Sequence, residues 1–410
     1  MFNILIFLLT INSFDSKKNK LVNKIDSIIE YSIKEKAFPG AQIIVMKDGE
    51  EVINKNYGYH TYDSVIKVKN NSIYDLASIT KPTAGAIALM KLYENNLLDL
   101  NKPLSHYIKF FNKSRVGEVL IKDYLQHISG IRPWIPFHST TKKEDGEFKR
   151  KTLSYNQKRR YSIKLTEDLY LFNNYKKEIY NQIKETHFID SDTVLYSGLF
   201  FYLIPEIVKN QTNKTFDKYV ENIFSSMNLD SILFNPTKKF NLETIVPTES
   251  DDFFRNFQIH GFVHDEGAAM MGGVSGNAGL FSNASNLSKV YQMFLDDGYI
   301  NGNKYLDKNV IGLFTQYNNE NDKFYRGLGF DKPKPTYDLD KCTYSKYSSD
   351  LSFGHSGYTG TFFWVDPKYN LIYIFLSNRV YDSRENRKIY DLNVRTNIHD
   401  IIYENLIEID

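Results

Sequence analysis

The 410-residue sequence has a single cysteine, Cys342, and almost no excess of one charge, since its net charge is +2. One cysteine excludes a disulfide framework and any zinc site built from several thiolates. The balance of charge excludes a dedicated nucleic-acid binder, which would need a strong basic excess. Hydrophobic residues make up 42% of the chain and charged residues 24%, which excludes a disordered or fibrous protein. The sequence therefore indicates a large globular protein with an ample core, a class in which enzymes are common.

The sequence also lacks a long hydrophobic run. Its apolar start, MFNILIFLLTINSF, covers about fourteen residues, whereas a helix needs about 20 to span a bilayer, so we expect no stable membrane span. The length fits the core of a signal peptide, although no basic residue precedes it and no small-x-small cleavage site follows. We expect residues 1–16 to be a signal peptide and the protein to be periplasmic or secreted. The alternative is a cytoplasmic protein whose first residues are a frayed or misassigned start of the chain.

Strand patterns lie near both ends of the chain. The segment AQIIVMKDGEEVINKNYGY, which begins at residue 41, predicts a hairpin with Asp48-Gly49 as its turn. The segment GTFFWVDPKYNLIYIFLSNRV at 360–380 predicts a second hairpin, turned at Asp366-Pro367. We therefore expect the two ends of the chain to contribute strands to one sheet.

Helical patterns follow or precede these strands and fill the middle of the chain. Apolar residues at helical spacing predict helices over 22–36 and about 386–406, and most of the middle shows the same periodicity. The economical arrangement is an α+β fold, an α/β-sandwich, in which helices flank an antiparallel sheet. We expect residues 21–75 and 266–410 to form this sheet domain and residues 76–265 an inserted, mostly helical domain. A cleft between two such domains is a natural place for a site.

A serine followed three residues later by a lysine occurs at Ser64, Ser78 and Ser139. Residues i and i+3 share one helix face, so the neutral amine of the lysine can accept the proton of the hydroxyl. Ser64 lies among β-branched residues and Ser139 in a polar loop, so no helix aligns those pairs. Ser78 opens a strongly helical segment, and Pro82 is tolerated only in the first turn, where free N–H groups favour negative charge. Ser78 with Lys81 is the candidate nucleophile pair; without further motifs a helix-capping serine would be the plainer interpretation.

Further motifs around this pair resemble those of a known family. DLASITKPTAGAIALMKLYE (75–94) resembles the nucleophile segment of the serine β-lactamase and penicillin-binding-protein superfamily, class C branch. LQHISGI (125–131) resembles the loop that follows it, and FGHSGYTGTFFWVDP (353–367) resembles the third motif, written K-T-G or H-x-G. GFVHDEGAAMMGGVSGNAGLFSNASNL (261–287) is similar to a segment of a subgroup that is often fused behind a family-3 glycoside hydrolase. The resemblance covers about 35–400 and implies a β-lactamase/transpeptidase-like fold.

The resemblance implies a role for each residue of the first two motifs. Ser78 would attack a carbonyl and form an acyl-enzyme, while Lys81 takes or relays its proton. Tyr196 matches the tyrosine of the Y-x-N motif and would be the partner base and proton donor; the alternative is a core tyrosine at a helix start. Gly198 replaces the asparagine of that motif, which argues against β-lactam turnover and leaves an inactive protein open.

The third motif supplies the remaining candidates. His355 stands where a β-lactamase usually has lysine, and an imidazole there could bind a substrate carboxylate or assist proton transfer. A purely structural histidine is the alternative. Ser356 and Gly357 would line the substrate, with the glycine allowing the strand edge to come close. The backbone N–H groups of Ser78 and Tyr358 would form the oxyanion hole.

Three other polar segments receive plainer interpretations. HDE at 264–266 is sequential, so its side chains are not expected to converge on a metal, and we expect it to form the rim of the site. GGVSGNAGLFS at 272–282 lacks the lysine of a phosphate loop, and its Ser275 lacks a paired base. The segment 141–160 holds eight basic and three acidic residues; it could attract an anionic polymer, but a solvated surface loop is the plainer interpretation.

The sequence thus predicts a serine hydrolase that acts through an acyl-enzyme on an amide, peptide or ester bond, with cell-wall turnover suggested by the family alone. The alternatives are a true β-lactamase and a catalytically inactive muropeptide-binding protein. We expect no cofactor and no metal. The expected partner is a small-molecule or peptidoglycan-derived substrate, with no nucleic acid, and the sequence leaves the oligomeric state open.

Overall fold

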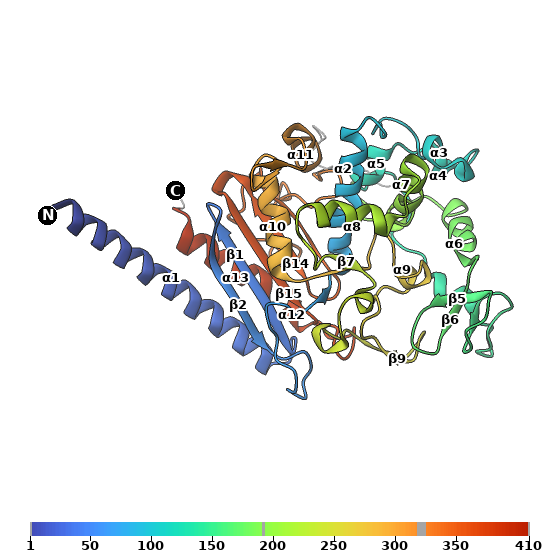
Figure 1. Cartoon of the computed structure of the whole chain (residues 1–410), viewed down its shortest axis with the longest axis horizontal. Coiled ribbons are helices and arrows are strands. Elements are labelled where there is room, and N and C mark those ends of the chain that lie inside the picture. Colours follow the sequence, from blue (N-terminus) through green and yellow to red (C-terminus); the bar gives the residue numbers. More distant parts are fainter. Residues whose placement is uncertain (1, 191–192, 318–324, 409–410) are drawn as a thin grey trace.

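The computed structural model describes residues 2–190, 193–317 and 325–408, and for residues 2–17 the backbone alone. Its main sheet is antiparallel, with strands in the order β13-β14-β15-β1-β2 (Figure 1). The bounds of these strands are β1 Gly40–Lys47, β2 Glu50–Gly58, β13 Phe353–Ser356, β14 Phe362–Asp366 and β15 Leu371–Ser377. Because β1 pairs with β15, the sheet joins the two ends of the chain. Both predicted hairpins and the predicted fold class are confirmed.

The central strand β15 is buried along its whole length because both faces of the sheet are covered. Leu371, Tyr373 and Phe375 enter one apolar cluster, while Ile372 and Ile374 between them enter the other, as the two-residue period of a strand requires. Helices α1 (Phe2–Lys34) and α13 (Val394–Leu406) cover the first face, and α10 (Ala284–Leu295) covers the second (Figure 1). The sheet is therefore the middle layer of a sandwich.

Two of the predicted helices differ from the observed ones at their bounds. The helix predicted over 22–36 is part of the longer α1. The helix predicted over 386–406 is divided into α12 (Lys388–Asp391) and α13, because Asn393 adopts a left-handed backbone with φ 47°. No helix in the described ranges is long and apolar enough to cross a membrane. The assignment of residues 1–16 as a signal peptide stays a prediction.

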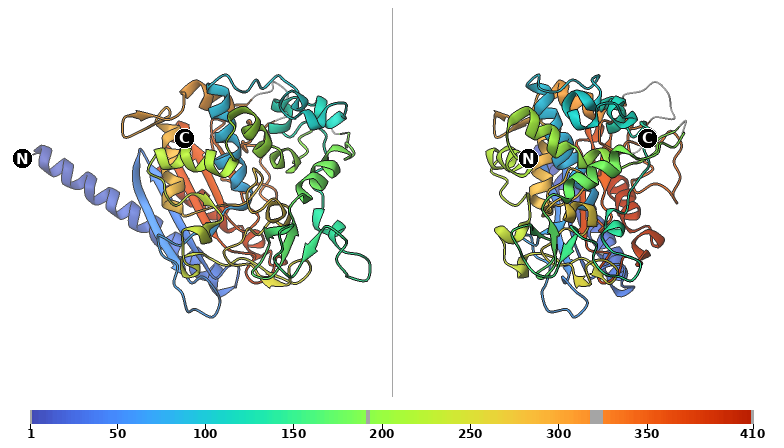
Figure 2. Two further views of the ribbon diagram at one scale, coloured as in Figure 1. Left: turned by 45° about the vertical axis from the view of Figure 1, so that its right-hand side comes forward. Right: turned by 90° about the vertical axis from the view of Figure 1, so that its right-hand side faces the viewer.

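Most of the rest of the chain packs against the α10 side of the sheet, opposite α1 (Figure 2), while a segment around Cys342 and Tyr344 joins α1 and α13 on the first face. One continuous apolar cluster runs from this sheet face through α2 (Ile87–Glu94) into the other helices. Those helices are α3 Leu104–Tyr107, α4 Arg115–Glu118, α5 Ile121–Leu125, α6 Tyr175–Lys184, α7 Ile204–Thr212, α8 Phe216–Ser226, α9 Glu266–Met270 and α11 Lys308–Thr315. The domain boundaries at 75/76 and 265/266 stay predictions.

The chain also contains short strands outside the main sheet, and those between residues 76 and 265, β4 to β9, were missed by the helical interpretation of the middle. A small sheet has the order β4-β6-β5, and another has the order β3-β10-β7. The remaining pairs are β8 with β9 and β11 with β12. The bounds are β3 Tyr74–Asp75, β4 Leu153–Ser154, β5 Tyr161–Lys164, β6 Tyr170–Phe172, β7 Leu233–Phe234, β8 Ser250–Asp251, β9 Phe257–Gln258, β10 Leu280–Ser282, β11 Tyr299–Ile300 and β12 Asn303–Lys304. Strands of two to four residues carry too few alternations to show in a sequence pattern. The pairing of β3 with β10 matters most, because it brings the segment before Ser78 next to the segment after residue 265.

Candidate active site

Ser78 lies in a 3₁₀ turn, Ala77–Ile79, that leads through a π-helical turn, Lys81–Ala86, into α2. Pro82 occupies the first turn of that helical stretch, as its missing N–H requires. Ala77 has a left-handed backbone with φ 47°, which is unusual for a residue with a side chain, and its N–H donates to Asp75 Oδ1 at 2.8 Å. The chain therefore bends sharply just before the serine, and a buried carboxylate holds the bend.

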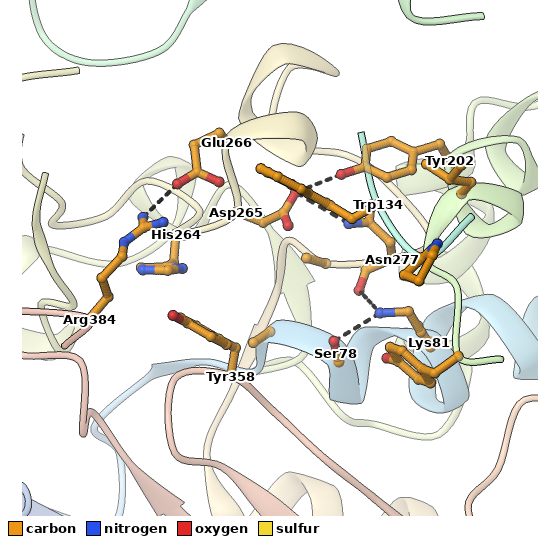
Figure 3. A pocket seen from close by; sticks show the side chains of 16 residues that line it. Ser78, Lys81, Trp134, Tyr202, His264, Asp265, Glu266, Asn277, Tyr358 and Arg384 are labelled. Atoms are coloured by element: carbon orange, nitrogen blue, oxygen red, sulfur yellow. Dashed lines mark hydrogen bonds and ion pairs between the residues drawn. The ribbon is translucent and has the colours of Figure 1, made fainter. Parts of the chain in front are cut away.

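The side chains of Ser78 and Lys81 are directly hydrogen-bonded. Lys81 Nζ lies 2.8 Å from Ser78 Oγ and donates a second hydrogen bond to the carbonyl of Asn277 at 3.1 Å (Figure 3). Only 3% of Lys81 is exposed, so the amine has little freedom to move away. This is the geometry that proton transfer from a serine hydroxyl to an amine requires.

Tyr196 lies beside this pair, just before the 3₁₀ turn Leu199–Tyr202. Its ring centre is 5.3 Å from Lys81 Nζ, and 38% of the residue is exposed. Two buried imidazoles flank the ring, with centres 4.6 Å away for His127 and 6.0 Å away for His355. Tyr196 is thus placed between the amine and two histidines.

Both histidines are held neutral by burial. Burial lowers the pKa of His355 to about 4, and the pKa of His127 is lowered well below its usual value by burial and by the nearby charges of Arg326 and Lys81. The N–H of Ser197 donates to His127 Nδ1 at 3.1 Å, which fixes the loop that carries Tyr196. The motif around His127 predicted a loop but not that His127 would lie beside Tyr196. Its contact with Ser197 joins residues 70 positions apart, and a local sequence pattern does not reveal such a contact.

The third motif is placed differently from the expectation. His355, in β13, is 2% exposed, and its Nδ1–H donates to the carbonyl of Ser356 at 2.8 Å. Its Nε2 has no hydrogen-bond partner among the described residues. His355 lies behind Tyr196, and in the described part of the chain His355, Ser356 and Gly357 are outside the cavity wall, whereas Tyr358 is in it.

Gly357 allows two backbone segments to meet. A Cβ atom at this position would lie 2.6 Å from the carbonyl oxygen of Leu76 and 2.0 Å from Thr361 Oγ1. The same turn is tied to the nucleophile segment by hydrogen bonds from Thr361 Oγ1 to Leu76 O at 3.1 Å and from Thr359 Oγ1 to Asp75 O at 2.8 Å. The close approach therefore fixes the turn between β13 and β14 against the residues that carry Ser78.

A cavity of about 390 Å³ opens over the serine. It brings together four predicted residues, Ser78, Lys81, Tyr196 and Tyr358, with Gly198 beside them. Its wall also includes residues that the sequence motifs did not assign: Pro133, Trp134, Tyr202, Asn277 and Arg384, together with the HDE segment, 264–266. The segment 264–266, expected at the rim of the site, thus lies in the wall of this cavity.

Gly198 leaves space beside Lys81. A Cβ atom there would meet only Lys81 Cε, at the ordinary contact distance of 3.9 Å. Its backbone, with φ −84° and ψ −13°, suits any residue. The backbone therefore accepts a Cβ atom at this position, and without a side-chain amide there Lys81 donates to the backbone carbonyl of Asn277.

The wall opposite Ser78 is built around two acidic side chains. Asp265 caps α9, and its Oδ1 accepts hydrogen bonds from the N–H of Ala268 at 2.7 Å, the hydroxyl of Tyr202 at 2.9 Å and the amide of Asn277 at 3.2 Å. Burial and the nearby Asp265 raise the pKa of Tyr202 well above its usual value, so its hydroxyl stays a donor. Asp265 is thereby fixed in one orientation.

Glu266 belongs to a second network. Arg384 Nη2 donates to Glu266 Oε1 at 2.5 Å and to Glu249 Oε2 at 2.6 Å, and His264 Nε2 lies 2.5 Å from the same Glu249 oxygen. Burial favours the neutral form of Glu249, but hydrogen bonds from His264 and Arg384 outweigh it and lower its pKa to about 2. Among the described residues no group of three or more His, Cys, Asp or Glu side chains could hold a metal ion.

The comparisons with known proteins agree over nearly the whole chain. The family model named Beta-lactamase matches residues 25–396. An N-acetylmuramyl-L-alanine amidase of Bacillus subtilis (strain 168) is 30% identical over 409 residues, covering 92% of this chain and 86% of that protein. A Salmonella enteritidis PT4 protein named "Putative D-alanyl-D-alanine carboxypeptidase" is 29% identical over 401 residues, with the same coverage. The crystal structure of a class C beta lactamase from Rhodobacter sphaeroides superposes with a TM-score of 0.63 at 14% identity, over 93% of this chain and 99% of that one, which shows the fold.

Proposed function

Since the chain belongs to the beta-lactamase family, we propose that it is a serine hydrolase that cleaves an amide bond of cell-wall material through an acyl-enzyme on Ser78. The observation that carries the proposal is the 2.8 Å hydrogen bond between Lys81 Nζ and Ser78 Oγ at a cavity of substrate size. The names of the two relatives, an amidase and a carboxypeptidase, support a peptidoglycan-related amide as substrate. Such a substrate favours a periplasmic or secreted location over a cytoplasmic one.

In the acylation step, Ser78 Oγ forms a bond to the carbonyl carbon while its proton passes to Lys81 Nζ. The backbone N–H groups of Ser78 and Tyr358 stabilise the negative oxygen of the tetrahedral intermediate. Tyr196 delivers a proton to the leaving nitrogen, the C–N bond breaks, and an amine departs. The location of all four residues at one cavity supports these roles.

In the deacylation step, water attacks the ester carbonyl and transfers its proton to Tyr196, which gave up its own proton in acylation, while Lys81 holds the proton that Ser78 will recover. The C–Oγ bond breaks, Ser78 recovers a proton, and a carboxylic acid is released. The buried, neutral ring of His355 supports Tyr196 from behind, so we assign His355 a positioning role. Ser356 and Gly357 act by shaping the turn that presents Tyr358 to the cavity.

The test is the intact mass of the full chain after mixing with benzylpenicillin or with an activated short-chain ester. A mass increase that is absent in Ser78→Ala and retained in Ser139→Ala is expected, because Ser139 belongs to a serine–lysine pair outside the cavity. Fast turnover of penicillin would identify a β-lactamase instead. No adduct with either reagent would overturn the proposal.

A muropeptide-binding protein without turnover is the second candidate function. It is favoured by Gly198, which removes the side-chain amide expected beside Lys81. The intact hydrogen bond between Lys81 and Ser78 favours the enzyme. If neither the parent chain nor Ser139→Ala is acylated but both bind a muropeptide, the protein is a binding protein and not an enzyme.

A further inference from the structure

One side of the cavity has no part in the acyl transfer described above. Trp134 lines the cavity and yet is 50% exposed. The other tryptophan of the chain, Trp364, is 1% exposed. A large apolar ring kept open to solvent in the wall of a cavity is a common feature of ligand-binding surfaces.

Asp265 lines the same cavity, and one of its carboxylate oxygens has no hydrogen bond from any residue that the structure describes. Asp265 Oδ1 accepts from Tyr202, Ala268 and Asn277, which saturates that oxygen and prevents rotation of the group. Figure 3 shows the other oxygen of Asp265 directed into the space between Trp134 and Ser78. This oxygen is a preoriented hydrogen-bond acceptor inside the cavity.

The charges around the cavity decide what kind of donor fits. Glu266 is paired with Arg384, and the amine of Lys81 also lies in the wall. Asp265 and Glu266 repel a ligand carboxylate, while Arg384 repels an added cation. A neutral group that carries several hydroxyl donors and an apolar face meets neither repulsion.

We propose that Trp134, Asp265 and Glu266 form a saccharide subsite of this cavity. The apolar C–H face of a pyranose ring stacks on the indole of Trp134, and its hydroxyls donate to the carboxylate oxygens of Asp265 and Glu266. The inference rests on the proposed function, because the sugar is the part of the substrate linked to the amide that Ser78 attacks. It identifies the substrate class as a glycopeptide rather than a bare peptide.

The experiment measures binding to full-length Ser78→Ala, so that no turnover takes place. The probes are N-acetylglucosamine, N-acetylmuramyl-L-alanine, its sugar-free analogue D-lactyl-L-alanine, and the cationic Nα-acetyl-lysine amide. Tryptophan emission reports on the site because Trp364 is buried and Trp134 is exposed. We expect a saturable blue shift with both sugars and at least tenfold tighter calorimetric binding of the muramyl compound than of D-lactyl-L-alanine.

The variants separate the subsite from general effects on the fold. In the Ser78→Ala background, Trp134→Phe is expected to abolish the emission change, and Trp134→Ala and the isosteric Asp265→Asn to weaken sugar binding tenfold or more. The control is Tyr155→Ala, which removes an exposed aromatic ring outside the cavity wall and is expected to bind sugars like the parent.

Three results would overturn the subsite: equal binding of the sugar-free analogue, tighter binding of the lysine amide, or sugar binding unaffected by Trp134→Ala. Acylation of the unmodified chain by the activated ester reports on the proposed function by itself. Sugar binding without acylation would therefore reject the hydrolase and keep the subsite. Acylation together with equal binding of the sugar-free and muramyl compounds would keep the hydrolase and reject the subsite.

Discussion

Replacement of Gly357 by alanine tests whether the close approach of two backbones positions the nucleophile. The new Cβ atom would lie 2.6 Å from the carbonyl oxygen of Leu76, while ordinary contact begins at 3.4 Å, so the segments must separate by the difference, about 0.8 Å. The same atom displaces the hydroxyl of Thr361, which donates to that carbonyl. Because Leu76 lies two residues before Ser78, the displacement moves the nucleophile relative to Tyr358.

Two effects of Gly357→Ala are expected. Overpacking lowers the free energy of unfolding by about 1–3 kcal/mol. A nucleophile displaced by nearly 1 Å acylates about 10- to 100-fold more slowly, since misplacement of this size costs on the order of 10²-fold in rate. The assays are urea unfolding and the rate of mass increase with the activated ester.

The matched control is Gly312→Ala in α11, where a Cβ atom meets nothing within 4 Å. This helical replacement is expected to raise stability by about 0.5–1 kcal/mol and to leave acylation unchanged. If Gly357→Ala unfolds and acylates like the parent chain, the close approach does not position the serine, and the reasoning fails.

Three other predictions concern the amine of Lys81, the side-chain amide that Gly198 lacks, and the buried imidazole of His355. Lys81→Arg should slow acylation by about 10²-fold or more, because a guanidinium cannot accept the serine proton; an unchanged rate of ester acylation would refute the role of Lys81 as base. Gly198→Asn should fold like the parent and acylate with benzylpenicillin about tenfold faster or more, since a hydrogen bond to a charged group contributes about 1.5–3 kcal/mol; an unchanged rate would show that Gly198 does not limit reaction with β-lactams. The pKa of His355 is about 4 in the folded chain, against an ordinary value of 6.5. The unfolded state therefore binds more protons between these values, and the free energy of unfolding falls as the pH is lowered through this window, by about 3 kcal/mol for this group. Urea unfolding from pH 7 to 4 should show this slope, and His355→Gln should reduce it; equal slopes would contradict the buried neutral imidazole.

Local features of the sequence were sufficient for the elements that carry the nucleophile. The spacing of Ser78 and Lys81, together with Pro82 one residue later, places serine and amine on one helical turn, and the structure joins them by a hydrogen bond. The two hairpins follow from turn residues and from strands of five to nine residues, which are long enough to be recognised by composition. These features involve residues within a few positions of one another, so the chain itself keeps them close.

The tertiary structure decided the rest of the site. His355 looked like a residue that touches substrate, because a motif preserves spacing along the chain but does not report how deeply a side chain is buried. Arg384 had no motif at all; it reaches the cavity because its guanidinium pairs with Glu249 and Glu266, 135 and 118 positions earlier. Contacts over such separations depend on the packing of the sheet, α9 and the segment after β15 against one another. The sequence alone therefore determined the architecture of the sheet and the spacing that pairs Ser78 with Lys81, and only the packing decided which side chains face this pair across the cavity.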